Sequence, residues 1–112
     1  MPQSLARNYI HIIFSTKHRQ PLIPMRFENE IHRYLAGICD RLECNPVITG
    51  GYTDHVHILC LLSKKIPLVN LVGHLKAYSS KWLKTKDVTF QDEYRIFLKK
   101  YNVEYDERYV WD

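Results

Sequence analysis

The order of hydrophobic and polar residues predicts a strand and then a helix in the first part of the chain. Residues 8–16 are rich in β-branched and aromatic side chains, which favour an extended strand. Residues 17–24 form a polar connection that contains two prolines. Between residues 26 and 42, apolar side chains recur at the spacing of one helical face, at Phe27, Ile31, Tyr34, Leu35, Ile38, Cys39 and Leu42.

Two more strands and a second helix are expected next. Residues 45–49 predict a short strand, the glycine pair at 50–51 predicts a break, and residues 55–62 predict a third strand. Pro67 suits the first position of a helix that extends to about Lys84. The apolar stripe of this helix consists of Leu68, Leu71, Val72, Leu75, Ser79 and Trp82.

The order strand, helix, strand, strand, helix is most of a ferredoxin-like split βαβ unit, so we expect an α+β fold with an antiparallel sheet. A last strand should follow the second helix, and residues 85–89 are too short to supply it. Residues 90–101 repeat apolar side chains at helical spacing, and an extended tail follows. We therefore expect a truncated domain over residues 1–86 and a C-terminal helix and tail over residues 87–112.

Length and composition are those of one globular domain. Of the 112 residues, 46% are hydrophobic and 25% are charged, which is typical of soluble proteins. No apolar run approaches the roughly 20 residues of a membrane span, and the start lacks the pattern of a signal peptide. Cys39, Cys44 and Cys60 show no CxxC spacing and suit free thiols, so the expected location is a reducing cytoplasm.

The third predicted strand begins with two histidines on one face. Side chains alternate along a strand, so His55 and His57 share a face, while Val56 and Cys60 lie on the other face under the helices. Two such imidazoles can hold a divalent ion, with Asp54 as an orienting acceptor or a further ligand. Spacing alone favours ordinary surface histidines, since no other His, Asp or Glu close in the sequence completes a site.

Basic residues give a weak indication of a nucleic-acid partner. The chain carries 16 Lys+Arg against 12 Asp+Glu, a net charge of +4. Lys17 and Arg19 leave the first strand and Lys76 lies on the second helix, where they could neutralise backbone phosphates. Ser79 and Ser80 could add hydrogen bonds to phosphate. Composition alone favours a solvated helix face for the scattered lysines.

Several motifs together resemble one known family. Residues 54–59, Asp-His-Val-His-Ile-Leu, resemble the His-hydrophobic-His signature of the HUH endonuclease superfamily. Residues 9–19, the Lys-x-x-Ser-Ser pattern at 76–80 and the tail segments within 90–107 are similar to its IS200/IS605-type, REP-associated tyrosine transposases. These matches occur in the family's order and cover nearly the whole chain.

The resemblance implies a substrate, a cofactor and a reaction. The substrate is single-stranded DNA with a hairpin, and the family forms homodimers whose active sites are shared between subunits. Mg²⁺ or Mn²⁺ would be held at the scissile phosphate by His55, His57 and a third ligand from a later helix. A tyrosine would attack phosphorus and keep the bond for strand joining. The resemblance also strengthens a phosphate-binding role for Arg19, Lys76 and Ser80.

The family's nucleophile segment has no counterpart in the sequence. Lys84 and the next two residues run directly into residues 87–90, where the family has a strand pair and a Tyr-Ile-x-Asn-Gln helix, so we infer an internal deletion. Tyr78 is expected on the helix side of the sheet, and Tyr52 is too close along the chain to the histidines. Tyr94 is a weak substitute, because it fits the apolar stripe of its own helix.

Three functions from different classes therefore remain open. The first is a metal-dependent transposase whose turnover is impaired, and the second is a DNA-binding remnant or regulator that does not cleave. The third, a ferredoxin-like protein-interaction domain with incidental histidines, fits the family's pattern least well. Without a last strand the first strand becomes a sheet edge, which favours pairing with a second chain and hence a homodimer.

Overall fold

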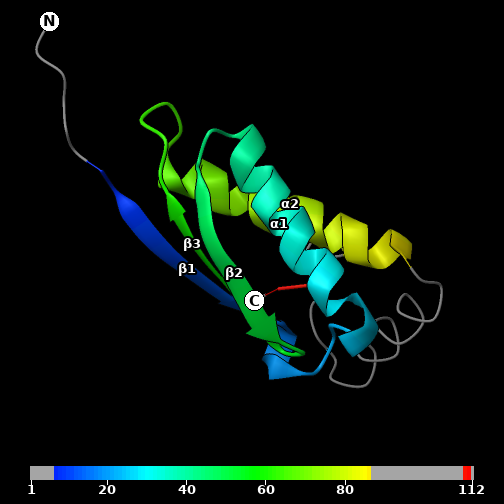
Figure 1. Cartoon of the computed structure of the whole chain (residues 1–112). Helices are drawn as coiled ribbons and strands as arrows, with labels where there is room; N and C mark the ends of the chain where they lie inside the picture. The colour runs from blue at the N-terminus through cyan, green and yellow to red at the C-terminus, as the bar shows by residue number, and fades with distance from the viewer. Residues whose placement is uncertain (1–6, 87–109, 112) are drawn as a thin grey trace, which may run out of the picture.

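An antiparallel sheet carries two helices on one of its faces (Figure 1). The computed structural model describes residues 7–86 and 110–111. Within them the sheet order is β1-β3-β2, with strands β1 (Tyr9–Ser15), β2 (Pro46–Tyr52) and β3 (His55–Leu61). The helices are α1 (Glu28–Arg41) and α2 (Leu68–Lys86), and two short 3-10 turns, η1 (Lys17–Arg19) and η2 (Met25–Phe27), precede α1.

The predicted α+β class and the strand–helix–strand–strand–helix order are confirmed. Helix α2 begins one residue later than expected, and the Pro67 carbonyl accepts hydrogen bonds from the Asn70 and Leu71 N–H groups. The predicted third helix lies outside the described residues, and the division into residues 1–86 and 87–112 remains a prediction. Within the described residues no helix is both long and apolar enough to cross a bilayer.

The glycine pair does not break the second strand, contrary to the sequence prediction. Strand β2 continues through Gly50 and Gly51 to Tyr52, which pairs with His55 of β3. At Gly51 φ is 146°, and a Cβ would lie 2.3 Å from the His55 carbonyl oxygen. Cross-strand hydrogen bonds outweigh the low strand propensity of glycine here, and only glycine allows so close an approach.

The core lies between the sheet and the two helices. Strand β3 alternates as the period of two requires, with its buried side chains at Val56, Ile58 and Cys60. Helix α1 contributes Ile31, Leu35, Ile38 and Cys39, and α2 contributes Leu71, Leu75 and Leu83. The three buried thiols are free, and burial raises the pKa of Cys39 to about 12. The predicted helical faces are therefore the packed faces, except that Leu68 of the predicted α2 stripe is 44% exposed and Leu83, outside that stripe, is buried.

A short C-terminal segment packs beside the end of β1 (red in Figure 1). We call Val110 and Trp111 the C-terminal pair; both are buried. The Val110 N–H donates to Ser80 Oγ at 2.8 Å, and Trp111 Nε1 donates to Ser79 Oγ at 3.0 Å. The Trp111 ring packs edge to face on the Phe14 ring, with centroids 4.7 Å apart. An antiparallel β-bridge joins the backbone of Trp111 to that of Thr16. The pair thus connects α2 to the end of β1.

We expect Trp111→Ala to lower the free energy of unfolding by about 3–5 kcal/mol, because it removes a fully packed aromatic side chain. Ser80→Ala should cost about 1–3 kcal/mol, since the buried Val110 N–H loses its acceptor. Urea denaturation followed by far-UV circular dichroism measures both. Val69→Ala, at a side chain that is 75% exposed, is the control and should change little. A Trp111→Ala variant as stable as the parent would contradict this packing.

Candidate metal and nucleic-acid site

One face of the sheet is turned away from the two helices (Figure 1). The alternation of β3, whose Val56 and Ile58 are buried, places His55 and His57 on that face. We call it the open face. By the alternation of each strand and by the register, it consists of Tyr9, His11, Ile13 and Ser15 of β1, Ile48, Gly50 and Tyr52 of β2, and His55, His57, Leu59 and Leu61 of β3. Tyr9, Ile13, Ile48 and Tyr52 are each more than half exposed. The face is therefore apolar as well as histidine-rich.

The imidazole of His57 lies between two others. Its ring stacks on His55 with centroids 6.1 Å apart, and it meets His11 edge to face at 5.5 Å. His11 comes from β1, where it stands opposite Leu59 and diagonal to His57. Reasoning along the sequence missed His11 because it is distant in the chain. His11 is found only from the pairing of β1 with β3, which places it on the same face as His57.

Asp54 fixes the orientation of His55. Its carboxylate lies 2.8 Å from His55 Nδ1, and this hydrogen bond, followed by the nearby Arg19 charge, holds the pKa of Asp54 below its ordinary value of 3.8. Arg19 Nη2 is 3.5 Å from the same carboxylate. With Nδ1 engaged, Nε2 of His55 is the nitrogen left for another ligand. A carboxylate that orients a histidine in this way is a frequent feature of metal sites.

Gly50 leaves room for the imidazole of His57. The two residues are partners in the β2–β3 register. A Cβ at position 50 would lie 3.0 Å from His57 Cε1 and 3.1 Å from Nε2. The glycine that interrupts the sequence pattern therefore determines where the His57 ring can lie.

The donor set fits part of a metal site. Two imidazoles, one of them oriented by a carboxylate, are suitable ligands for a divalent ion. As they stand, no three His, Cys, Asp or Glu side chains of the described residues are arranged to hold a metal ion. A third ligand must therefore come from a change of rotamer, from water or from outside the described residues.

The predicted phosphate-binding residues separate into two groups. Arg19 is 63% exposed in its side chain and lies beside Asp54 and Ser15, at the end of the sheet that holds His55. Lys17 belongs to the same turn, and its N–H donates to the Val110 carbonyl. Lys76 lies on the helix side of β1, with Nζ 5.9 Å from the centre of the Phe14 ring. One groove of about 610 Å³ beside β1 is lined by both Arg19 and Lys76.

Ser79 and Ser80 are not available to a phosphate in this arrangement. Both are completely buried, and both hydroxyls accept hydrogen bonds from the C-terminal pair. The sequence pattern places these serines on the correct helix, but it does not reveal that the tail covers them.

The described tyrosines occupy different sides of the sheet. Tyr78 lies on α2 and stacks on His74 at 5.5 Å, so it is with the helices, away from the open face. Tyr52 stands opposite His55 on the open face and is 55% exposed. The hairpin therefore brings Tyr52 beside the histidines, although it is close in sequence. Tyr94 lies outside the described residues.

We expect Gly50→Ala to weaken binding of Mn²⁺ by about 10-fold while leaving the fold intact, because the added methyl group displaces the His57 ligand nitrogen. Isothermal titration calorimetry measures the affinity. Gly37→Ala, where a Cβ meets nothing within 4 Å, is the matched control on α1. Equal Mn²⁺ affinities for the Gly50 variant and the parent would show that His57 does not bind the ion.

Comparison with known proteins identifies the fold and the family of this chain. A crystal structure of a protein from Deinococcus radiodurans R1, provisionally assigned as a transposase, has the same fold, with a TM-score of 0.70 at 19% identity. The match covers 77% of this chain and 66% of that chain, and no curated protein matches in sequence. The family model described as "Transposase IS200 like" matches residues 4–110. Because this match spans almost the whole sequence, the chain belongs to the family of IS200-like transposases.

Proposed function

We propose that this chain binds single-stranded DNA beside a hairpin and holds a divalent ion, Mg²⁺ or Mn²⁺, on one phosphate through His55 and His57. We further propose that strand cleavage by this chain alone is impaired. Family membership supports the DNA substrate. The observation that carries the proposal is the series of contacts from Arg19 to Asp54 and from Asp54 to His55. These contacts place the positive charge of the Arg19 guanidinium near the two imidazoles.

The charges and the exposed side chains fit a flexible anionic strand. Arg19 lies next to the proposed ion site, so a phosphate bound there meets a second positive charge. Tyr9, Ile13 and Tyr52 offer exposed aromatic and apolar surface on the open face, against which unpaired bases can stack. Lys17 and Lys76 add positive charge at the end and the side of β1. We place this binding in the cytoplasm, where buried free thiols remain reduced.

The reaction that the family resemblance implies requires a tyrosine nucleophile in line with the scissile bond. A tyrosine oxygen attacks phosphorus, the bond from phosphorus to the 3′ oxygen breaks, and that oxygen takes up a proton. A bound divalent ion would act as a Lewis acid on the phosphate. The residues of this chain would bind and orient the phosphate: Asp54 fixes the His55 ring, and Arg19 would contact the phosphate oxygens. Cross-strand partners project to the same side of the sheet, so Tyr52 lies beside His55, and we infer that it is too close to His55 to attack in line a phosphate held there.

The position of the described tyrosines favours a second candidate, a DNA-binding remnant or regulator that does not cleave. Tyr78 is on the helix side, and Tyr52 is the cross-strand partner of His55 on the same face as the histidines. The interaction-domain alternative has no observation in its favour. The inferred internal deletion remains a prediction.

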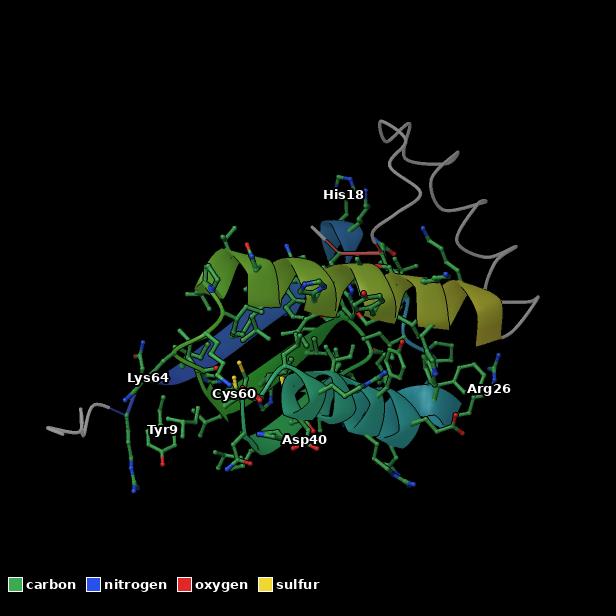
Figure 2. All side chains as sticks on the ribbon, turned by 90° about the horizontal axis from the view of Figure 1, so that it is seen from above. Tyr9, His18, Arg26, Asp40, Cys60 and Lys64 are labelled. Atoms are coloured by element: carbon green, nitrogen blue, oxygen red, sulfur yellow. The ribbon has the colours of Figure 1, made fainter. Side chains whose placement is uncertain are left out.

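We expect Arg19→Gln to weaken binding of a labelled single-stranded hairpin and to reduce the slope of log affinity against log salt by about 0.7, the value for one phosphate contact on a single strand. Fluorescence anisotropy between 50 and 200 mM salt, the range over which such contacts are sensed, measures both quantities. Lys76→Gln should have a smaller effect. Lys65→Gln is the control, because Lys65 forms an ion pair with Glu43 far from Arg19. Figure 2 shows this separation through two chain neighbours: Lys64, next to Lys65, lies well apart from His18, next to Arg19.

The same hairpin tests cleavage. Incubation with Mn²⁺ followed by denaturing electrophoresis should show no covalent adduct between protein and DNA. An adduct that disappears in Tyr52→Phe would overturn the proposed impairment and identify the nucleophile. Absence of any DNA binding by the parent chain would instead overturn the proposed function.

We also propose a homodimer. Within the described residues β3 is the only strand paired with β1, and the C-terminal pair meets the other side of the chain only beyond the end of β1, at Thr16 and Lys17. The remaining length of that side is suited to pairing with a second chain. Such pairing lies in the plane of the sheet and leaves the open face to DNA, although it covers part of the groove near Lys76. Sedimentation velocity at micromolar concentration should therefore show a dimer. A single monomeric species at every concentration would contradict the pairing.

A further inference from the structure

Turn η1 holds two consecutive residues in a left-handed backbone conformation. The angle φ is 54° at His18 and 55° at Arg19. Residues with a Cβ rarely adopt this region, because the Cβ comes too close to the following carbonyl oxygen. Neither residue is a glycine, so the surrounding structure must impose the conformation. The strained turn carries Arg19, which the proposed function assigns to phosphate binding.

Thr16 forms hydrogen bonds across this turn. It is completely buried, and its hydroxyl can donate to the Gln20 carbonyl at 2.5 Å or to the Asp54 carbonyl at 3.0 Å. Its own carbonyl accepts the Arg19 N–H at 2.9 Å, and its N–H donates to the Asp54 carbonyl at 2.9 Å. These bonds close the chain from Thr16 to Gln20 into a turn and tie that turn to Asp54.

The closed turn determines where the Arg19 guanidinium lies. Its Nη1 lies 3.2 Å from Ser15 Oγ, and its Nη2 lies 3.5 Å from the Asp54 carboxylate. Both contacts direct the side chain towards the end of the sheet that holds His55. An extended backbone at Arg19 would point its Cα–Cβ bond in a different direction. The left-handed conformation therefore places the guanidinium beside the proposed ion site.

We propose that Thr16 is a positioning residue for phosphate binding: it holds η1 in the left-handed conformation, and this conformation presents the Arg19 guanidinium to a phosphate at His55. The inference rests on the proposed function, because it requires Arg19 to contact DNA. A guanidinium that is held in place before binding loses less side-chain freedom when the phosphate arrives. The folded chain maintains the strain, and the DNA contact gains from it.

Binding of the labelled single-stranded hairpin to variants of the whole chain tests the inference. Thr16→Val keeps the shape of the side chain and removes the hydroxyl, so it should bind about 5-fold more weakly, the upper value for one exposed ion pair. Its slope of log affinity against log salt should fall by about 0.7, as for Arg19→Gln. Thr16→Ser keeps the hydroxyl and should bind as the parent does. Circular dichroism reports the fold of each variant, and Thr16→Ala replaces Thr16→Val if the latter does not fold.

Two comparisons separate positioning from a general loss of stability. In the Arg19→Gln background Thr16→Val should cause no further loss of DNA affinity, because Thr16 acts through Arg19. His18 is exposed at the edge of the molecule (Figure 2), and His18→Asn and His18→Val both remove its imidazole. Asparagine tolerates the left-handed region, whereas a β-branched residue does not. We therefore expect His18→Val to bind the hairpin more weakly than His18→Asn.

The outcomes separate this inference from the proposed function. If the parent binds no DNA, the proposed function and the inference both fail. If folded Thr16→Val binds as the parent does while Arg19→Gln binds more weakly, Arg19 contacts the phosphate without Thr16 and the inference alone is overturned. An equal loss from Thr16→Val in the parent and in the Arg19→Gln background would show a purely structural role and would also overturn it. Equal affinities of His18→Val and His18→Asn would show that the left-handed turn does not position Arg19.

Discussion

The pairing of β1 with β3 is the constraint on which the site depends. Seven residues of each strand are in register, from Tyr9 opposite Leu61 to Ser15 opposite His55. This register places His11 diagonal to His57, and it carries the chain from Ser15 through η1 to Arg19 beside Asp54. Because side chains alternate, a shift by one residue would turn the open-face side chains of β1 into the core. Burial of Ile12 and Phe14 against the helices therefore holds His11 on the open face.

The end of β1 is fixed from two sides. The Thr16 N–H donates to the Asp54 carbonyl at 2.9 Å, and the Lys17 N–H donates to the Val110 carbonyl at 3.1 Å. The first bond ties β1 to the hairpin that carries Asp54 and the histidines. The second ties it to the C-terminal pair, which is in turn held by the α2 serines. The turn η1, with Lys17 and Arg19, and the start of β3, with His55 and His57, thus belong to one hydrogen-bonded unit.

Local patterns predict the fold well and the site only in part. Period-two alternation correctly places His55 and His57 opposite Val56 and Cys60, because a buried strand face is a local property of its sequence. The His11 contact depends on a pairing between segments more than 40 residues apart, and no local period encodes it. The burial of Ser79 and Ser80 depends on a tail that returns from 30 residues away. The extension of β2 through its glycines likewise follows from its partner strand rather than from its own composition.

The buried C-terminal pair affects how the protein should be prepared. A fusion tag added after Asp112 begins one residue beyond a tryptophan that is only 2% exposed. Such a tag would leave the molecule beside Thr16 and the turn η1, close to Lys17 and Arg19. A tag added before residue 7 leaves from the end of β1 that is remote from that turn (Figure 1). Samples for metal and DNA measurements should therefore carry their tag at the N-terminus and none after residue 112.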